Sequence, residues 1–178
     1  MNAAYIYLQV YRLFDNITPI KADCGELCSK ACCSGDDGGM YLFPMEEQVY
    51  KLINPSWSRI EESDFTYEYN GKTKNVPIIF CNGACDRYQR PLACRIFPLT
   101  PYLNGDKLDV IVDPRAKSLC PLSKALEVDE YDYKFVKNIK KAFTLLMKID
   151  EFRAYMRAYS EYIDEYRKFF SDGSIIDE

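Results

Sequence analysis

Apolar residues recur with helical spacing at both ends of the chain. Near the N-terminus the pattern predicts a helix over residues 4–15. Beyond residue 126 two more apolar stripes predict a C-terminal helical hairpin over residues 126–170, with Asp150 capping its second helix. The stripes are Ile6, Val10, Leu13 and Phe14; Phe135, Ile139, Phe143 and Leu146; and Phe152, Met156, Tyr159, Ile163 and Tyr166.

The middle of the chain has the alternating pattern of β-strands. Phe65, Tyr67 and Tyr69 alternate with polar residues, and the Asn-Gly pair at 70–71 predicts a tight hairpin with a return strand over 73–80. A second hairpin is predicted from 101–103 to 108–112 through the Asn-Gly pair at 104–105. A short strand over 40–43 and a helix opening at Pro44 with two acidic residues, Glu46 and Glu47, precede them. We therefore expect an α+β fold in a single domain, 1–178, whose core over 24–122 bears the cysteines.

Composition narrows the kinds of site that this chain can form. It has eight cysteines and no histidine, which excludes Ser-His and Cys-His catalytic pairs and leaves thiolates as the main metal ligands. The net charge of −4, with basic and acidic residues interleaved, does not favour nucleic acid or anionic membranes as partners. No long apolar run and no export signal are evident, so we expect a cytoplasmic location with reduced thiols.

The cysteines form two groups of four separated by about 50 residues. If residues 28–32 are helical, the i, i+4 spacing puts Cys28 and Cys32 on one face, where one ion could bind both at ~2.3 Å per sulfur. The adjacent pair Cys32 and Cys33 should diverge, which predicts a second ion, a bridging thiolate or a cysteine that binds no metal. The alternatives to a metal site are buried core thiols, a disulfide framework and thiol redox chemistry. The eight residues are Cys24, Cys28, Cys32, Cys33, Cys81, Cys85, Cys94 and Cys120.

The segment from Cys81 to Pro98 resembles the signature of the YkgJ-like family, the CxxCxxCC zinc- or iron-chelating domain. Shared features are a cysteine run ending in a doublet, a later cysteine, a tyrosine, an Arg-Pro-x-x-Cys-Arg stretch that leads to Phe-Pro, and a final cysteine. The resemblance extends from Cys24 to Leu122. This chain departs from the family in the three-residue spacings of its leading run and in the single residue between Tyr88 and Arg90.

The resemblance implies a metal site built from all eight cysteines, which holds zinc or iron, the latter also as an iron–sulfur cluster. A protein with a similar cysteine constellation, flagellin lysine-N-methylase, makes a metalloenzyme the alternative, although no glycine-rich nucleotide motif is present here. Arg90 and Arg95 flank Cys94 and either offset the charge of the thiolates or pair with surface acids. A protein partner, if one binds, is expected at the C-terminal helices.

Overall fold

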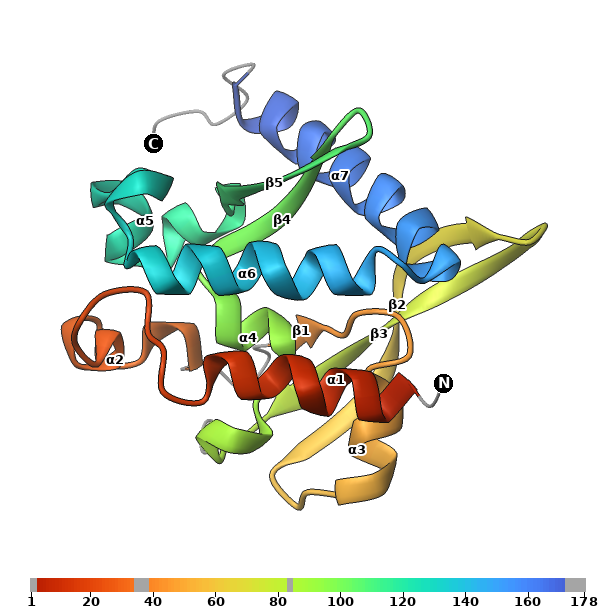
Figure 1. The fold of residues 1–178 in the computed structure, drawn as a ribbon, viewed down its shortest axis with the longest axis horizontal. Helices are drawn as coiled ribbons and strands as arrows, with labels where there is room; N and C mark the ends of the chain where they lie inside the picture. The colour runs from red at the N-terminus through yellow and green to blue at the C-terminus, as the bar shows by residue number, and fades with distance from the viewer. Residues whose placement is uncertain (1–2, 34–38, 83–84, 172–178) are drawn as a thin grey trace, which may run out of the picture.

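A computed structural model describes residues 3–33, 39–82 and 85–171 of the protein (Figure 1). The described residues form helices and two antiparallel sheets, which confirms the α+β fold class. No helix in these described ranges is long and apolar enough to cross a lipid bilayer.

The N-terminal stripe forms a helix as predicted, in two pieces. Helix α1 spans Ala3–Tyr11 and continues as the 3-10 turn η1, Arg12–Phe14. Tyr7, Val10 and Phe14 are buried on its inner side. Figure 1 shows α1 lying beside α6, and the amide of Asn138 in α6 donates a hydrogen bond to the Leu13 carbonyl oxygen at 2.6 Å. The first helix is therefore docked on the C-terminal hairpin.

The larger sheet has the strand order β1-β3-β2 and is wholly antiparallel. The predicted hairpin is present, but β2 begins seven residues before Phe65 and carries an irregularity between Glu62 and Thr66. Asn70 and Gly71 both have positive φ, 52° and 69°, the conformation that an Asn-Gly hairpin turn requires. The strands are β1, Gly39–Tyr41; β2, Ser58–Tyr69; and β3, Lys72–Cys81.

The second hairpin pairs β4, Leu99–Asn104, with β5, Lys107–Val112. Asn104 pairs with Lys107, so the turn residues are Gly105 and Asp106, one position later than predicted. Gly105 has a φ of 61°, which glycine adopts without steric cost.

The C-terminal hairpin is confirmed and closes the main core. Helix α6 spans Tyr133–Leu146, with Asp132 accepting hydrogen bonds at its N-terminus, and α7 spans Asp150–Ser171. Phe43, which follows β1, lies among aromatic rings of both helices, 5.1 Å from Phe143 and 5.7 Å from Phe152 between ring centroids. The same buried cluster contains residues of α1, α4 and both sheets, so the cysteine-bearing part and the helical tail share one core.

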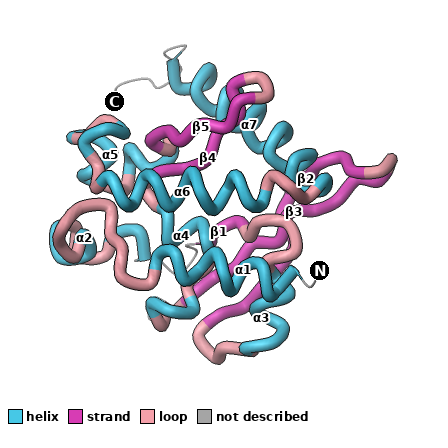
Figure 2. The backbone as a smooth tube through the Cα atoms, in the orientation of Figure 1, coloured by secondary structure: helices cyan, strands magenta, loops and turns pink. Residues whose placement is uncertain are grey.

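Short helical turns and loops connect these elements. Figure 2 shows that loop connects the first helical segment to α2. The short elements are α2, Cys24–Leu27; η2, Ala31–Cys33; α3, Glu47–Ile53; η3, Arg87–Gln89; α4, Leu92–Ile96; η4, Pro114–Ser118; α5, Pro121–Ala125; and η5, Val128–Glu130. They contain four of the eight cysteines, Cys24, Cys32, Cys33 and Cys94.

Candidate metal centre

The first cysteine group lies on a chain reversal. Helix α2 is capped by Asp23, whose side chain accepts a hydrogen bond from the Gly25 amide at 2.9 Å, and it ends at Leu27. Ser29 and Lys30 then take left-handed conformations, with φ of 50° and 59°. The Lys30 amide donates to the Gly25 carbonyl at 2.9 Å, which is the closing bond of a Schellman motif.

This reversal means that residues 28–32 are not the continuous helix that would place Cys28 and Cys32 on one face. Cys28 is the residue that ends α2, and Cys32 belongs to the separate turn η2. A continuous α-helix cannot pass through two left-handed residues, because L-residues in that conformation reverse the helical path. Left-handed backbone costs free energy at non-glycine residues, so the surrounding contacts must hold this turn in place.

The cysteine doublet does not diverge as expected. The sulfurs of Cys32 and Cys33 lie 3.8 Å apart, about the ~4 Å expected for two thiolates on one tetrahedral ion. A hydrogen bond between the two thiols lowers the pKa of Cys33 to about 6, helped by Arg90 and Lys30 and opposed by burial. The same hydrogen bond, together with burial, raises the pKa of Cys32. The hydrogen bond therefore favours the thiolate form of Cys33 over that of Cys32.

The second group is positioned by the end of β3 and by α4. Cys81 is the last residue of β3, where it pairs with Ser58. Arg90 is extended, as a residue before proline should be, and Pro91 turns the chain into α4, which carries Cys94. Helix α4 contacts α1, β1 and β4, so Cys94 has a firm support.

Thiols of the two groups are close enough to influence one another electrostatically. Burial raises the pKa of Cys94, and the thiols of Cys33, Cys85 and Cys81 raise it further. Cys33 comes from the first group and the other three from the second. The fold thus gathers these four thiols in one region, across nearly 50 residues of sequence.

The gathered thiols are not arranged as a closed site. Within the described part of the chain, no group of three Cys, Asp or Glu side chains has the spacing of a metal centre. The side chain of Cys24 lies outside the described residues, as do 34–38 and 83–84.

Cys120 is positioned by different elements. It immediately precedes α5, is buried, and its amide donates to the Ala116 carbonyl at 2.8 Å. Burial raises the pKa of Tyr131, and the nearby thiol of Cys120 raises it further. The Tyr131 hydroxyl is buried without a hydrogen-bond partner among the side chains that the structure describes.

The two arginines next to Cys94 have different surroundings. Arg90 donates from Nε to the Cys85 sulfur at 3.2 Å. Burial acts to lower the pKa of Arg90, but this hydrogen bond and the nearby thiols of Cys85, Cys33 and Cys94 outweigh it, so the pKa is raised. Arg90 is thus placed to offset thiolate charge.

Arg95 instead binds backbone and an acid. Its guanidinium donates to the carbonyl oxygens of Arg90 at 2.7 Å, Tyr88 at 2.6 Å and Tyr11 at 3.2 Å. It also pairs with Asp15 at 3.2 Å, and it is buried. These contacts tie α4 to the end of the first helix, which is a structural role.

Glu46 is a buried carboxylate that the sequence pattern does not distinguish from a surface acid. Its Oε1 accepts hydrogen bonds from the Tyr11 hydroxyl at 2.5 Å and the Leu92 amide at 2.6 Å, and Oε2 accepts from the Phe43 amide at 3.0 Å. Burial raises the pKa of Glu46 to about 7, although these three donors and Arg95 oppose the rise. Glu46 therefore joins α1, the end of β1 and α4, where the sequence predicted only an acid in the first turn of a helix.

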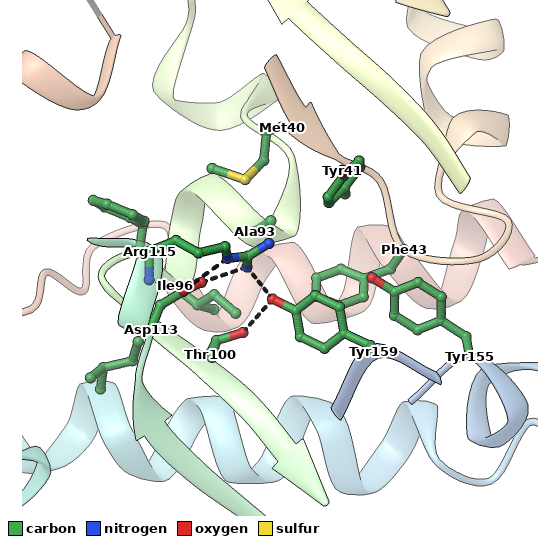
Figure 3. Close-up of a pocket in the computed structure, with 12 residues that line it drawn as sticks. Met40, Tyr41, Phe43, Ala93, Ile96, Thr100, Asp113, Arg115, Tyr155 and Tyr159 are labelled. Atoms are coloured by element: carbon green, nitrogen blue, oxygen red, sulfur yellow. Dashed lines mark hydrogen bonds and ion pairs between the residues drawn. The ribbon is translucent and has the colours of Figure 1, made fainter. Parts of the chain in front are cut away.

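A small pocket elsewhere in the core is closed by its own ion pair. Figure 3 shows Arg115 between Asp113 and Tyr159, with Thr100 bonded to Tyr159. Arg115 makes two hydrogen bonds to the Asp113 carboxylate, at 2.9 and 2.6 Å, and Asp113 caps η4. The pocket holds only about 20 Å³, and its cation is already neutralised.

Comparisons with protein-family models, with curated proteins and with solved structures find no match to this chain. The resemblance to the YkgJ-like family therefore stays an interpretation of the cysteine and arginine pattern.

Proposed function

We propose that this protein binds zinc or iron through its cysteines, and that both cysteine groups contribute to one centre. The observation that carries the proposal is that thiols of both groups lie near Cys94. Cys33 of the first group and Cys81 and Cys85 of the second all raise the pKa of Cys94. Four thiols are the number that a tetrahedral zinc or iron ion takes.

The donor set fits such an ion. Sulfur must be deprotonated to bind metal, and Cys33, whose pKa is lowered to about 6, supplies a thiolate at neutral pH. Arg90 contacts Cys85 and interacts with Cys33 and Cys94, so it would offset the negative charge that four thiolates leave on a divalent ion. When bound, the metal would link the chain reversal at 28–33 to β3 and α4.

Cys24, Cys28, Cys32 and Cys120 are the remaining proposed ligands. The 3.8 Å separation of the doublet sulfurs would let Cys32 join the same ion or a second metal next to it. Elemental analysis of protein purified without oxygen, with metal counted per chain, tests the proposal. Absorption at roughly 400 nm identifies an iron–sulfur cluster, and a colourless protein that contains zinc identifies a thiolate zinc site. Metal-free protein under these conditions would reject the function.

A further inference from the structure

A second small pocket lies beside Cys94, between the end of the first helical segment and α4. It holds about 50 Å³, and its lining includes Arg87, Arg90, Arg95 and Cys94. A water-sized position requires ~10–15 Å³, so the pocket has room for about three to five non-hydrogen atoms. A carboxylate or a phosphate group has that size.

The three arginines do not use their donors equally. A guanidinium has five N–H donors. Arg95 directs its nitrogens to three carbonyl oxygens and to Asp15. Arg87 uses two donors, from Nε to the Asp15 carbonyl at 3.3 Å and from Nη2 to the Ile17 carbonyl at 3.2 Å. Its guanidinium is held in place while its other N–H groups stay available.

Arg87 and Arg90 also lack acidic partners. Among the described residues, no carboxylate oxygen forms an ion pair with either one, whereas Arg95 pairs with Asp15 and Arg115 with Asp113. Arg90 bonds through Nε to Cys85, which leaves its two terminal nitrogens. The pocket thus presents two guanidinium groups without carboxylate partners, next to a third whose charge is matched by Asp15.

We propose that this pocket binds a small dianionic oxyanion group, of the size and charge of phosphate. Among the described residues neither Arg87 nor Arg90 has a carboxylate partner, and their planar forks suit the oxygens of phosphate. The fixed position of Arg87 reduces the ordering cost of binding. The Arg115 pocket is a poorer candidate for anion binding. Its cation is neutralised by Asp113, and its volume is less than half that of the pocket beside Cys94. The proposal does not depend on bound metal.

Isothermal titration calorimetry of the protein as purified, at constant ionic strength, tests the pocket with inorganic phosphate and with acetate as probes. We expect saturable one-to-one phosphate binding at millimolar concentration or below, at least about tenfold tighter than acetate, because phosphate carries more negative charge than acetate at neutral pH and has more oxygens to accept hydrogen bonds. Absence of saturable phosphate binding, or equal affinity for acetate, would overturn the proposal.

Variants assign the binding to the pocket. Arg87→Gln should weaken phosphate binding at least about tenfold, since hydrogen bonds to charged groups are lost. Arg87→Lys retains the positive charge but loses the planar guanidinium group, so it should bind phosphate with intermediate affinity. This variant replaces Arg87→Gln in the test if the glutamine variant does not fold. Arg59→Gln, which removes an exposed arginine paired with Glu61, is the matched control and should bind like the wild type. Equal losses in the Arg59 and Arg87 variants would contradict a specific site.

Metal counted in the same samples separates this proposal from the metal proposal. Phosphate binding by metal-free protein would preserve the oxyanion pocket and reject the metal function. Metal-loaded protein that does not bind phosphate would preserve the metal function and reject the oxyanion pocket. Arg87→Gln should leave the metal content unchanged, because the hydrogen bonds of its guanidinium go to the carbonyls of Asp15 and Ile17, not to a thiol.

Discussion

Glu46 should give the protein a stability term that changes with pH. Its pKa in the folded chain is about 7, against an ordinary value of 4.5. Between these values the folded chain holds a proton that the unfolded chain has released. The stabilisation from this proton is complete below about pH 4.5 and is lost as the pH rises through about 7. Each pKa unit corresponds to about 1.4 kcal/mol, so the rise accounts for about 3 kcal/mol.

The Glu46→Gln variant isolates this term. Glutamine keeps an oxygen that can accept from Tyr11 and Leu92, but its amide nitrogen would face the Phe43 amide and lose that hydrogen bond, a cost of about 1–3 kcal/mol at every pH. The variant cannot titrate at this position. The free energy of unfolding of the wild type, minus that of the variant, should therefore fall by about 3 kcal/mol from pH 4.5 to pH 8.

Urea unfolding followed by far-ultraviolet circular dichroism, for both proteins at several pH values, measures this difference. Other groups that titrate in this range, including Cys33, contribute to both proteins and largely cancel. A difference that stays constant within about 1 kcal/mol over this range would refute the reasoning. It would mean that the three donors around Glu46 fully compensate its burial and keep it ionised.

Three further predictions concern the cysteine region. Removal of metal by a strong chelator should expose residues 24–40 to protease while helical circular dichroism persists, because the segment has few apolar residues and α6 and α7 pack in the aromatic core. Unchanged protease resistance after verified metal removal would contradict this. Elemental analysis should show that Cys33→Ser and Cys94→Ser each lose more than one ion's share of the metal bound per chain. If the two cysteine groups instead form two independent centres, each variant should lose only the metal of its own centre. Arg95→Ala should lower the free energy of unfolding by about 3–5 kcal/mol in urea, because Asp15 and three carbonyl oxygens lose their partner; a loss below about 1 kcal/mol would show that these contacts contribute little.

Local sequence signals predicted most of the secondary structure. The 3.6-residue stripes of α1, α6 and α7 and the Asn-Gly turn at 70–71 depend on side-chain periodicity and on backbone preferences within a few residues. The positions of the cysteines in the sequence likewise defined the two groups of candidate ligands. Tight turns were predicted less exactly, since Gly105 and Asp106, not Asn104 and Gly105, form the second hairpin turn.

Long-range packing decided what the sequence left open. Residues 28–32 do not form one helix, because the reversal at Ser29 and Lys30, with its closing hydrogen bond, outweighs the cost of two left-handed residues. The burial of Glu46 follows from the meeting of α1, β1 and α4, three segments whose contact no local pattern encodes. The same packing brings Cys33 to the region of Cys94 and separates the roles of Arg90 and Arg95. The sequence alone pointed to the cysteines and the neighbouring arginines as candidate functional residues. The tertiary structure decided which of them lie close together, because burial and charge interactions depend on distance in space.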